Sequence, residues 1–312
     1  AAEACLQGEQ PLDSSKRAAA PAAIRQQAKR RRSAKKRMVY GIVTIGPAGV
    51  GKTTMCHALQ IHGRLHKRGI YVVNLDPAAD TLPYEPDIDV RELIRVEDAM
   101  REFGYGPSGG FIYCMEYLAM HLEWLEDKIS EFGEDDTLLF DCPGQIELYT
   151  HLRAMPQLVR ALQESCHVKL CATFLVDAVS IDQPAKFVAA ALAGLSAMLQ
   201  LPVPHVTVLS KSDALGDEAK LEAFLEEGSA VLFVRNQNQI RDEEGRTPNR
   251  SHDRLHDAIC SVLDDHAMLS YVPFTVKDED AAAHVLAFCD HLTMYSENAE
   301  VNIPKDLDGD SG

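Results

Sequence analysis

The stretch Gly46-Pro47-Ala48-Gly49-Val50-Gly51-Lys52-Thr53 decides how the rest of this sequence is interpreted. It lies between an apolar run, Val39–Ile45, and a helical pattern over about Lys52–Lys67. Glycines in such a loop allow successive backbone N–H groups to point inward, and the first turn of the helix adds partial positive charge. The stretch therefore predicts a phosphate-binding loop. The residues expected to bind the nucleotide there are Gly49, Val50, Gly51, Lys52, Thr53 and Thr54.

Two side chains of this loop have specific expected roles. The Lys52 ammonium would meet the β- and γ-phosphates, and Thr53 would offer its hydroxyl to Mg²⁺. The alternative is a chance glycine-rich turn. However, the full motif stands between a predicted strand and a predicted helix, as phosphate binding requires.

Apolar strands and helical patterns alternate along most of the chain. A second strand is expected at Ile70–Leu75, parallel to the first because a helix connects the two. Runs typical of buried strands recur at Thr137–Phe140, Ala172–Val176 and Val206–Leu209. We predict an α/β protein with the three-layer P-loop nucleotide hydrolase fold and a mostly parallel, doubly wound sheet.

Two helical patterns fall between the second and third of these strands. A short one is expected near Val90–Phe103, and an amphipathic helix is expected at Met115–Phe132, which carries the only tryptophan, Trp124. The nucleotide-binding domain is expected to span residues 38–297, with a helical insertion around 214–256 and an acidic tail at 298–312.

Residues 1–37 are expected to form a disordered, basic extension, because they lack sustained apolar periodicity. They carry ten Lys and Arg against three Asp and Glu, whereas the whole chain has a net charge of −16. The basic run Lys29–Arg37 is compatible with a nuclear-import signal, an organelle transit peptide, a solvated tail, or sequence upstream of a true start at Met38.

The acidic remainder of the chain argues against non-specific binding to nucleic acid or to an anionic membrane, since both require excess positive charge. The eight cysteines include no CxxC pair. They are interpreted as reduced thiols of an intracellular protein. A cytoplasmic location, with shuttling to the nucleus as an option, is the expectation.

A second group of residues with expected chemistry follows the strand that ends at Phe140. Asp141 would be the carboxylate on the Mg²⁺ side, acting through water, and would form the metal site with Thr53. Gly144 would offer its N–H to the γ-phosphate, while Gln145 and Glu147 would orient the attacking water. A helix N-cap is the alternative for Asp141, and ordinary polar residues of a first helical turn are the alternative for the other two side chains.

Asp76, at the end of the second strand, would face the same crevice, because ligands in such sheets lie beyond the carboxyl ends of the strands. There it would contact the hydration shell of Mg²⁺ or the attacking water. A turn-forming Asp-Pro pair is the alternative.

Base selection is assigned to Ser210-Lys211-Ser212-Asp213, which follows an apolar strand. The carboxylate of Asp213 would accept from the N1–H and N2–H₂ donors of guanine, with the stem of Lys211 packed along the base. Adenine presents an acceptor at N1, so the same carboxylate would disfavour it. GTP and GDP are therefore the expected nucleotides.

With these motifs in hand, the chain resembles the GPN-loop GTPases over about residues 38–304. Further likeness lies in Asn74-Leu75-Asp76-Pro77-Ala78 and in Asp141-Cys142-Pro143-Gly144-Gln145-Ile146-Glu147-Leu148-Tyr149. Within the family the chain is most similar to the third eukaryotic paralogue, through Cys114-Met115-Glu116-Tyr117 and Leu195-Ser196-Ala197-Met198.

The resemblance implies a dimeric GTPase, either a homodimer or a heterodimer with a paralogue. Its Gly-Pro-Asn loop would reach into the partner's nucleotide site. It also implies a role in the assembly of RNA polymerase II, by binding polymerase subunits, and in the nuclear import of that enzyme.

The chain departs from the family pattern in three places. The loop at residues 106–110 begins Gly106-Pro107-Ser108, with Ser in place of Asn, and Pro107 and Ser108 are carried over as catalytic candidates. Ser210 stands where the family usually has Thr or Asn, and the base-contacting motif at Pro273–Val276 is weak.

Two functions remain open on these grounds. One is an intrinsic GTP hydrolase whose cycle opens and closes a dimer. The other is a non-hydrolysing, nucleotide-gated scaffold for polymerase assembly. A kinase with the same loop is disfavoured, because the segments that contain Gln145 and Asp213 are typical of hydrolytic switches.

A substitution at Ser108 tests whether the missing amide matters. If the Asn side chain of the family loop contacts phosphate or water, Ser108→Asn hydrolyses GTP faster than the parent, because the amide restores a second donor. Single-turnover phosphate release measures this rate. A variant no faster than the parent means that the loop acts through its backbone and shape.

Overall fold

A seven-stranded sheet forms the centre of the protein. The structure is a computed structural model that describes residues 39–133, 135–227, 258–259, 261–263 and 271–295. The strand order is β3-β2-β4-β1-β5-β6-β7, and each neighbouring pair is parallel. This confirms the expected α/β class with a parallel sheet. The expected extension at 1–37, the tail at 298–312 and residues 228–256 of the insertion lie outside the described residues.

Five strands occupy the apolar runs expected from the sequence: β1 has the expected bounds, β2 ends one residue earlier, and β4, β5 and β6 are longer. The sequence analysis did not predict β3 and β7 as strands. The central strand β1 is buried along its whole length, as is typical of a strand covered on both faces. The strands are β1 (Val39–Ile45), β2 (Ile70–Asn74), β3 (Ile88–Asp89), β4 (Thr137–Asp141), β5 (Val168–Asp177), β6 (His205–Ser210) and β7 (Tyr271–Phe274).

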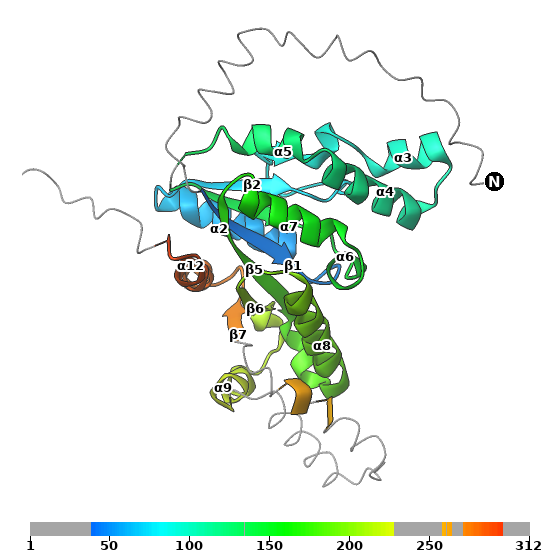
Figure 1. Cartoon of the computed structure of the whole chain (residues 1–312). Helices are drawn as coiled ribbons and strands as arrows, with labels where there is room; N and C mark the ends of the chain where they lie inside the picture. The colour runs from blue at the N-terminus through cyan, green and yellow to red at the C-terminus, as the bar shows by residue number, and fades with distance from the viewer. Residues whose placement is uncertain (1–38, 134, 228–257, 260, 264–270, 296–312) are drawn as a thin grey trace, which may run out of the picture. The chain divides into compact units, whose positions relative to one another are not determined.

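Helices cover both faces of this sheet, so the protein has three layers (Figure 1). One face is covered by α2 (Lys52–Leu65) and α12 (Glu279–Thr293), which contact each other. The other helices are α3 (Val96–Phe103), α4 (Pro107–Met120), α5 (Leu122–Ile129), α6 (Glu147–Thr150), α7 (Ala154–Glu164), α8 (Pro184–Gln200) and α9 (Glu218–Glu227). Short 3₁₀ turns are η2 (Val90–Glu92), η3 (Ala178–Asp182) and η4 (Ser212–Ala214).

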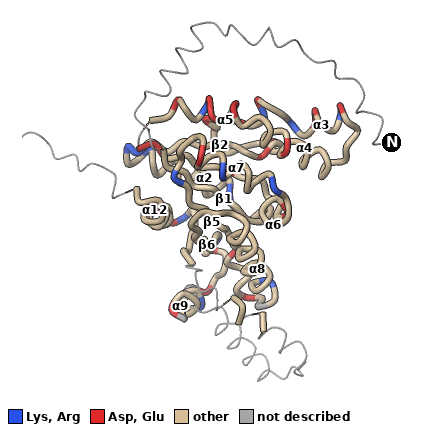
Figure 2. Tube along the Cα trace, in the orientation of Figure 1, with Lys and Arg blue, Asp and Glu red and all other residues tan. Residues whose placement is uncertain are grey.

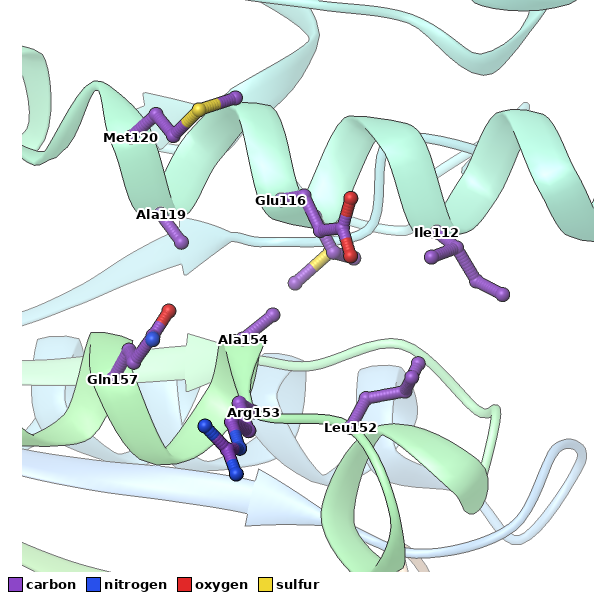
Figure 3. Close-up of a pocket in the computed structure, with 9 residues that line it drawn as sticks. Ile112, Glu116, Ala119, Met120, Leu152, Arg153, Ala154 and Gln157 are labelled. Carbon is purple, nitrogen blue, oxygen red and sulfur yellow. The ribbon is translucent and has the colours of Figure 1, made fainter. Parts of the chain in front are cut away.

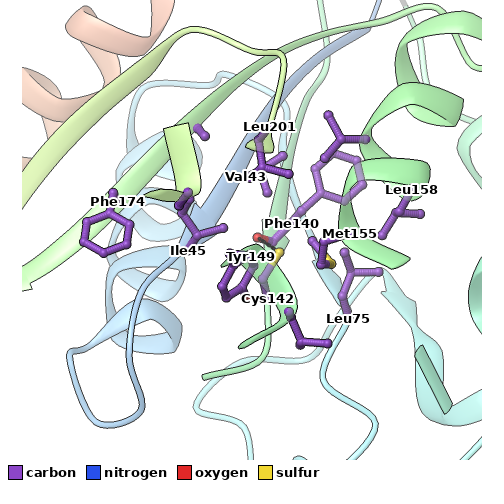
Figure 4. Packing of buried hydrophobic residues seen from close by; sticks show 14 of the residues in the cluster. Val43, Ile45, Leu75, Phe140, Cys142, Tyr149, Met155, Leu158, Phe174 and Leu201 are labelled. Atoms are coloured by element: carbon purple, nitrogen blue, oxygen red, sulfur yellow. Dashed lines mark hydrogen bonds between the residues drawn. The ribbon is translucent and has the colours of Figure 1, made fainter. Parts of the chain in front are cut away.

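The two faces of the sheet carry separate hydrophobic clusters, because side chains alternate along a strand. On β1, Ile42 belongs to the cluster under α2 and α12, whereas Val43 and Ile45 belong to the cluster on the opposite face. Figure 4 shows part of the cluster that contains Val43 and Ile45, where Phe140 of β4 lies near Met155 of α7. The sheet is thereby held between two packed layers, and its strand ends have a defined position.

The helical region before β4 differs from the sequence-based expectation. The single helix expected at Met115–Phe132 is two helices, α4 and α5, separated at His121, which has φ −114° and ψ 40°. Helix α4 also begins eight residues earlier than expected, with Pro107 in its first turn, a position that proline favours. The pattern missed this start because two glycines follow, yet Gly110 packs so closely on α3 that an added Cβ would lie 2.9 Å from Cγ of Met100.

Acidic residues recur along α3 and α5, where the tube in Figure 2 is coloured red: Glu97, Asp98 and Glu102 on α3, and Glu123, Glu126 and Asp127 on α5. In the part of the chain that the structure describes, no helix combines the length and the apolar character needed to cross a membrane. The six cysteines that are described, among them Cys56 and Cys142, are free thiols.

His205, the first residue of β6, makes the stability of the fold sensitive to pH. Its Nδ1 lies 2.7 Å from the carbonyl oxygen of Val203, and its Nε2 is buried without a hydrogen-bond partner among the described residues. Burial lowers the pKa of this imidazole to about 4. Histidine in an unfolded chain has a pKa near ~6.5, so protonation favours unfolding between these two values.

We expect the free energy of unfolding to fall as the pH drops from about 6.5 towards 4. His205→Gln keeps a polar side chain but cannot titrate, so its loss of stability over this range should be smaller than that of the parent. Urea unfolding at several pH values measures the difference. Equal losses in both proteins would show that His205 is not a source of the effect.

Candidate nucleotide-binding site

The loop between β1 and α2 has the backbone of a phosphate cradle. Gly46, Gly49 and Gly51 have φ values of 142°, 75° and 99°, which side-chain-bearing residues rarely adopt. At Gly46 an added Cβ would also lie 2.8 Å from the carbonyl oxygen of Leu175. The loop therefore turns tightly at the end of β1 and leads into the N-terminus of α2, where a helix offers free N–H groups.

The Lys52 ammonium is held inside this loop. Its side chain is largely buried, and Nζ donates 3.0 Å hydrogen bonds to the carbonyl oxygens of Gly46 and Pro47. Burial lowers the pKa of this amine, although the charge of Asp141 acts in the opposite direction. The cation is thus positioned by backbone groups and remains available to an anion that enters the loop.

Two carboxylates meet at the carboxyl edge of the sheet, because β2 and β4 are adjacent parallel strands. The backbone N–H of Leu75 donates a 2.9 Å hydrogen bond to the carbonyl oxygen of Asp141. Burial raises the pKa of both Asp76 and Asp141. For Asp141 the hydroxyls of Tyr84 and Thr53 and the Lys52 ammonium offset part of this rise.

These groups line one cleft of about 180 Å³. Six of the predicted site residues are among its walls: Gly49, Lys52, Thr53, Asp76, Asp141 and Gly144. The remaining lining residues are Ala48, Asn74, Ala79, Leu82 and Cys142. A buried ammonium, a hydroxyl and two carboxylates therefore lie within one small volume.

Asn74 is a cleft residue to which the sequence analysis assigned no role. It is fully buried at the end of β2, its Oδ1 accepts from the N–H of Asp76 at 3.1 Å, and its amide donates to Asp89 at 2.9 Å. Arg91 in turn contacts the Asp89 carboxylate through several hydrogen bonds. A polar residue ending a buried strand was the available signal, and this network fixes the backbone that carries Asp76.

Gln145 and Glu147 are not among the cleft residues. The Gln145 carbonyl oxygen accepts from the N–H of Leu148 at 3.2 Å, and Glu147 is the exposed first residue of the short helix α6. Pro107 and Ser108 are exposed in the first turn of α4 and also lie outside the cleft lining. In this structure, none of these four candidates forms a wall of the cleft.

The predicted base-reading residues follow β6. Both oxygens of Asp213 have partners from the segment after β7: Thr275 donates to Oδ1 at 2.8 Å, and the Lys277 ammonium lies 2.7 Å from Oδ2. These hydrogen bonds lower the pKa of Asp213. Lys211 has φ 56° and pairs with Asp177 at 2.8 Å. The weak motif at Pro273–Val276 thus supplies a side chain to this site.

Ser210 links the base-reading strand to the phosphate loop. Its side chain is buried, and its hydroxyl oxygen lies 2.7 Å from the carbonyl oxygen of Val50 and 3.2 Å from that of Val176. A hydroxyl has one hydrogen to donate, and the shorter contact is to the loop. The position of Asp213 is therefore tied to the geometry of the phosphate cradle.

A larger cavity of about 340 Å³ opens elsewhere, between α4 and the start of α7 (Figure 3). None of the predicted site residues lines it. Its walls are Ile112, Met115, Glu116, Ala119, Met120, Leu152, Arg153, Ala154 and Gln157. Because the phosphate loop, Lys52 and the two carboxylates line the smaller cleft, we place the nucleotide there.

The cleft fits a magnesium ion of the kind that accompanies a nucleotide. Across the described ranges, no group of three or more His, Cys, Asp or Glu side chains could hold a metal by itself. Mg²⁺ at a phosphate loop does not need such a group, because phosphate oxygens and waters complete its coordination. Oδ1 of Asp141 is buried and makes no hydrogen bond of ordinary length to the described residues, so it is an acceptor open to such a hydrated ion.

Comparison with known proteins agrees with this site. A family model described as "Conserved hypothetical ATP binding protein" matches residues 44–295. A protein named GPN-loop GTPase 3 from Mycosarcoma maydis is 40% identical over 280 residues, which cover 86% of this chain and 96% of that protein. Its namesake from Saccharomyces cerevisiae is 39% identical over 271 residues, with 85% and 96% covered. This chain belongs to the GPN-loop GTPase family.

Among solved structures, a GTPase in apo form from Pyrococcus abyssi is similar, with a TM-score of 0.67 and 23% identity over 81% of this chain and 97% of that one. This likeness supports the P-loop fold. The GPN-loop relatives are named GTPases, in agreement with the expected enzyme class, although the family model's description mentions ATP. The expected resemblance to the third paralogue also agrees with the relatives' names.

Gly144 provides a test of the cleft. It lies against the phosphate loop, and an added Cβ would be 2.8 Å from Cα of Ala48, which is backbone and cannot move aside freely. We expect Gly144→Ala to weaken GTP binding or hydrolysis by about tenfold or more, because the two segments must separate. Nucleotide titration and single-turnover assays measure this.

Gly133→Ala is a matched control, because Gly133 does not line the cleft and an added Cβ there meets no atom closer than 3.4 Å, on the Asp136 side chain. If Gly144→Ala binds and hydrolyses GTP like the parent, close packing of Gly144 on Ala48 is not required.

Proposed function

We propose that this protein is a Mg²⁺-dependent GTP-binding and GTP-hydrolysing switch that acts as a dimer in the assembly of RNA polymerase II and in its import into the nucleus. The observation that carries the enzymatic part is the cleft in which Lys52, Thr53, Asp76 and Asp141 converge. The cellular part rests on the resemblance to the GPN-loop GTPases.

Phosphate binding is supported by the loop and its lysine. Loop N–H groups and the N-terminus of α2 would hold the phosphate oxygens. In this structure the Lys52 ammonium is hydrogen-bonded to the carbonyl oxygens of Gly46 and Pro47. With nucleotide bound, it would exchange these contacts for the β- and γ-phosphates. The amine is already close to the loop, so little side-chain entropy is lost when the nucleotide binds.

The metal is supported by Thr53 and Asp141, which would hold it through a hydroxyl and through water, respectively. When bound, Mg²⁺ would neutralise the charge that develops on the phosphates. Without a nucleotide and its cation, Asp76 and Asp141 carry more negative charge than Lys52 can balance. Burial raises the pKa of both carboxyls.

Activation of water is supported most directly by Asp76. This carboxylate lines the cleft, is half-buried, and is held by the N–H of Ala78 at 2.9 Å. A carboxylate with a raised pKa is a suitable acceptor for a proton of the attacking water. Gln145 and Glu147 would reach this water only if the segment around Gly144 moves when GTP binds.

Guanine selection is supported by Asp213, whose two carboxylate oxygens match the two donors of guanine. In this structure both oxygens are occupied, by Thr275 and Lys277. Entry of guanine would replace at least one of these contacts. Lys277 is the simpler one to displace, because its side chain is 78% exposed.

The dimer is supported by the surface around the start of α4. Residues 106–109 are exposed, and the neighbouring rings of Phe103 and Tyr105 are 49% and 45% exposed. An exposed loop flanked by aromatic side chains is suited to contact a second protein. A homodimer and a heterodimer with a GPN-loop paralogue are both compatible with this surface. Polymerase subunits as partners, and a cytoplasmic protein that shuttles to the nucleus, follow from the resemblance.

A non-hydrolysing scaffold is the second candidate. It is favoured by the place of Gln145 and Glu147 outside the cleft and by Ser108, which replaces the Asn of the family loop. In that case the nucleotide would still control partner binding, but no phosphate would be released.

Single-turnover GTP hydrolysis with and without EDTA separates these functions. We expect Mg²⁺-dependent phosphate release, reduced at least about tenfold by Lys52→Ala and by Gln145→Leu, because the first loses the phosphate cation and the second the water-orienting amide. Lys67→Ala is a control, since Lys67 follows the end of α2 and is exposed.

Parent protein that binds GTP tightly but releases phosphate no faster than the uncatalysed reaction would establish the scaffold instead. Loss of binding in Lys52→Ala, without loss in Gln145→Leu, would then locate the nucleotide without assigning hydrolysis to it.

A further inference from the structure

Tyr84 makes a buried contact that the proposed reaction does not use. It lies between β2 and β3, is only 7% exposed, and packs in the hydrophobic cluster under α2 and α12. From there its hydroxyl donates a 2.6 Å hydrogen bond to Oδ2 of Asp141. A buried tyrosine hydroxyl needs a partner, and here the partner is the carboxylate at the end of β4.

The two oxygens of Asp141 therefore have different surroundings. Oδ2 accepts the 2.6 Å hydrogen bond of Tyr84, whereas Oδ1 is buried and makes no hydrogen bond of ordinary length to the described residues. The Thr53 hydroxyl is a neighbouring group that helps to keep down the pKa of this carboxyl. An unpaired buried acceptor is costly unless a further group binds to it. Because Asp141 and Thr53 line the same cleft, this further group would lie beside the Thr53 hydroxyl.

Tyr84 belongs to the same segment as other walls of the cleft. This segment, residues 75–87, contributes Asp76, Ala79 and Leu82 to the lining. The Tyr84 hydroxyl bond thus joins the segment that carries one carboxylate to the strand end that carries the other. The ring is fixed by packing, so the hydroxyl has a defined position from which to hold Asp141.

We propose that Tyr84 is a positioning residue that fixes the orientation of the Asp141 carboxylate and leaves Oδ1 as the oxygen available to the hydration shell of Mg²⁺. This inference rests on the proposed Mg²⁺-dependent function. With Oδ2 engaged, the carboxylate meets the hydrated ion through one oxygen. Without the Tyr84 hydroxyl, the carboxylate rotates more freely, and the favourable orientation is populated less.

Tyr84→Phe tests this assignment, because it removes the hydroxyl and keeps the packed ring. The probe is fluorescent GDP bound to the full chain, titrated with MgCl₂. We expect the Mg²⁺ concentration at half-maximal tightening to rise about three- to tenfold, as loss of one charge-assisted hydrogen bond predicts. GDP affinity in EDTA should stay within about twofold of the parent value, since Tyr84 contacts the carboxylate and not the loop.

Two further variants make the result specific. Tyr71→Phe is the matched control: Tyr71 lies on β2, packs against Phe132 with ring centroids 4.9 Å apart, and does not line the cleft. In an Asp141→Asn background, Tyr84→Phe should cause no further change in the Mg²⁺ requirement, because its effect passes through the carboxylate. Thermal unfolding without nucleotide and Mg²⁺ confirms that each variant is folded.

An unchanged Mg²⁺ requirement in folded Tyr84→Phe would overturn the assignment. Equal losses of GDP affinity with and without Mg²⁺ would also overturn it, because they would indicate a general role in the structure. If instead the parent protein binds GDP and hydrolyses GTP without any need for Mg²⁺, the proposed function itself fails, and the role of Tyr84 fails with it.

Discussion

The buried ammonium of Lys52 is the interaction on which the rest of the site depends. Two backbone carbonyl oxygens, of Gly46 and Pro47, hold this charge at the edge of the sheet. A buried cation is costly unless polar groups or an anion compensate for the lost water. The loop satisfies the amine with partial charges only, so the full negative charge of a phosphate can replace them favourably.

The parallel sheet explains why the carboxylates are close to this amine. In strand order, β4 lies between β1 and β2, so the phosphate loop, Asp141 and Asp76 follow the ends of three adjacent strands. Clusters on both faces of the sheet keep these ends in place. The constraint has an electrostatic consequence: two carboxylates beside an anionic nucleotide repel it unless a cation is present. The need for Mg²⁺ in the proposed reaction follows from this balance of charge.

Contacts across the sheet also connect the phosphate and base ends of the site. The Ser210 hydroxyl reaches the Val50 carbonyl from β6, and three residues later Asp213 is held by Thr275 and Lys277. If guanine replaced Thr275 or Lys277 at Asp213, the change would occur only three residues from Ser210, which contacts the phosphate loop. Near β2 and β4, on the side of β1 away from β6 in strand order, Tyr84 holds Asp141 and Asn74 holds the backbone of Asp76. The reacting groups are thus supported from several elements that are distant in sequence.

The amino-acid sequence by itself determined the phosphate loop, the strand that precedes it and the helix that follows, because glycine backbone freedom and apolar periodicity are local properties. It also predicted six of the residues that line the cleft, since parallel strands end at one edge. Only the tertiary structure decided that Pro107 starts helix α4, because close packing of Gly110 on α3 outweighs the low helix propensity of glycine. The contacts of Tyr84 with Asp141 and of Thr275 with Asp213 join residues 57 and 62 positions apart, and no local pattern specifies such pairs.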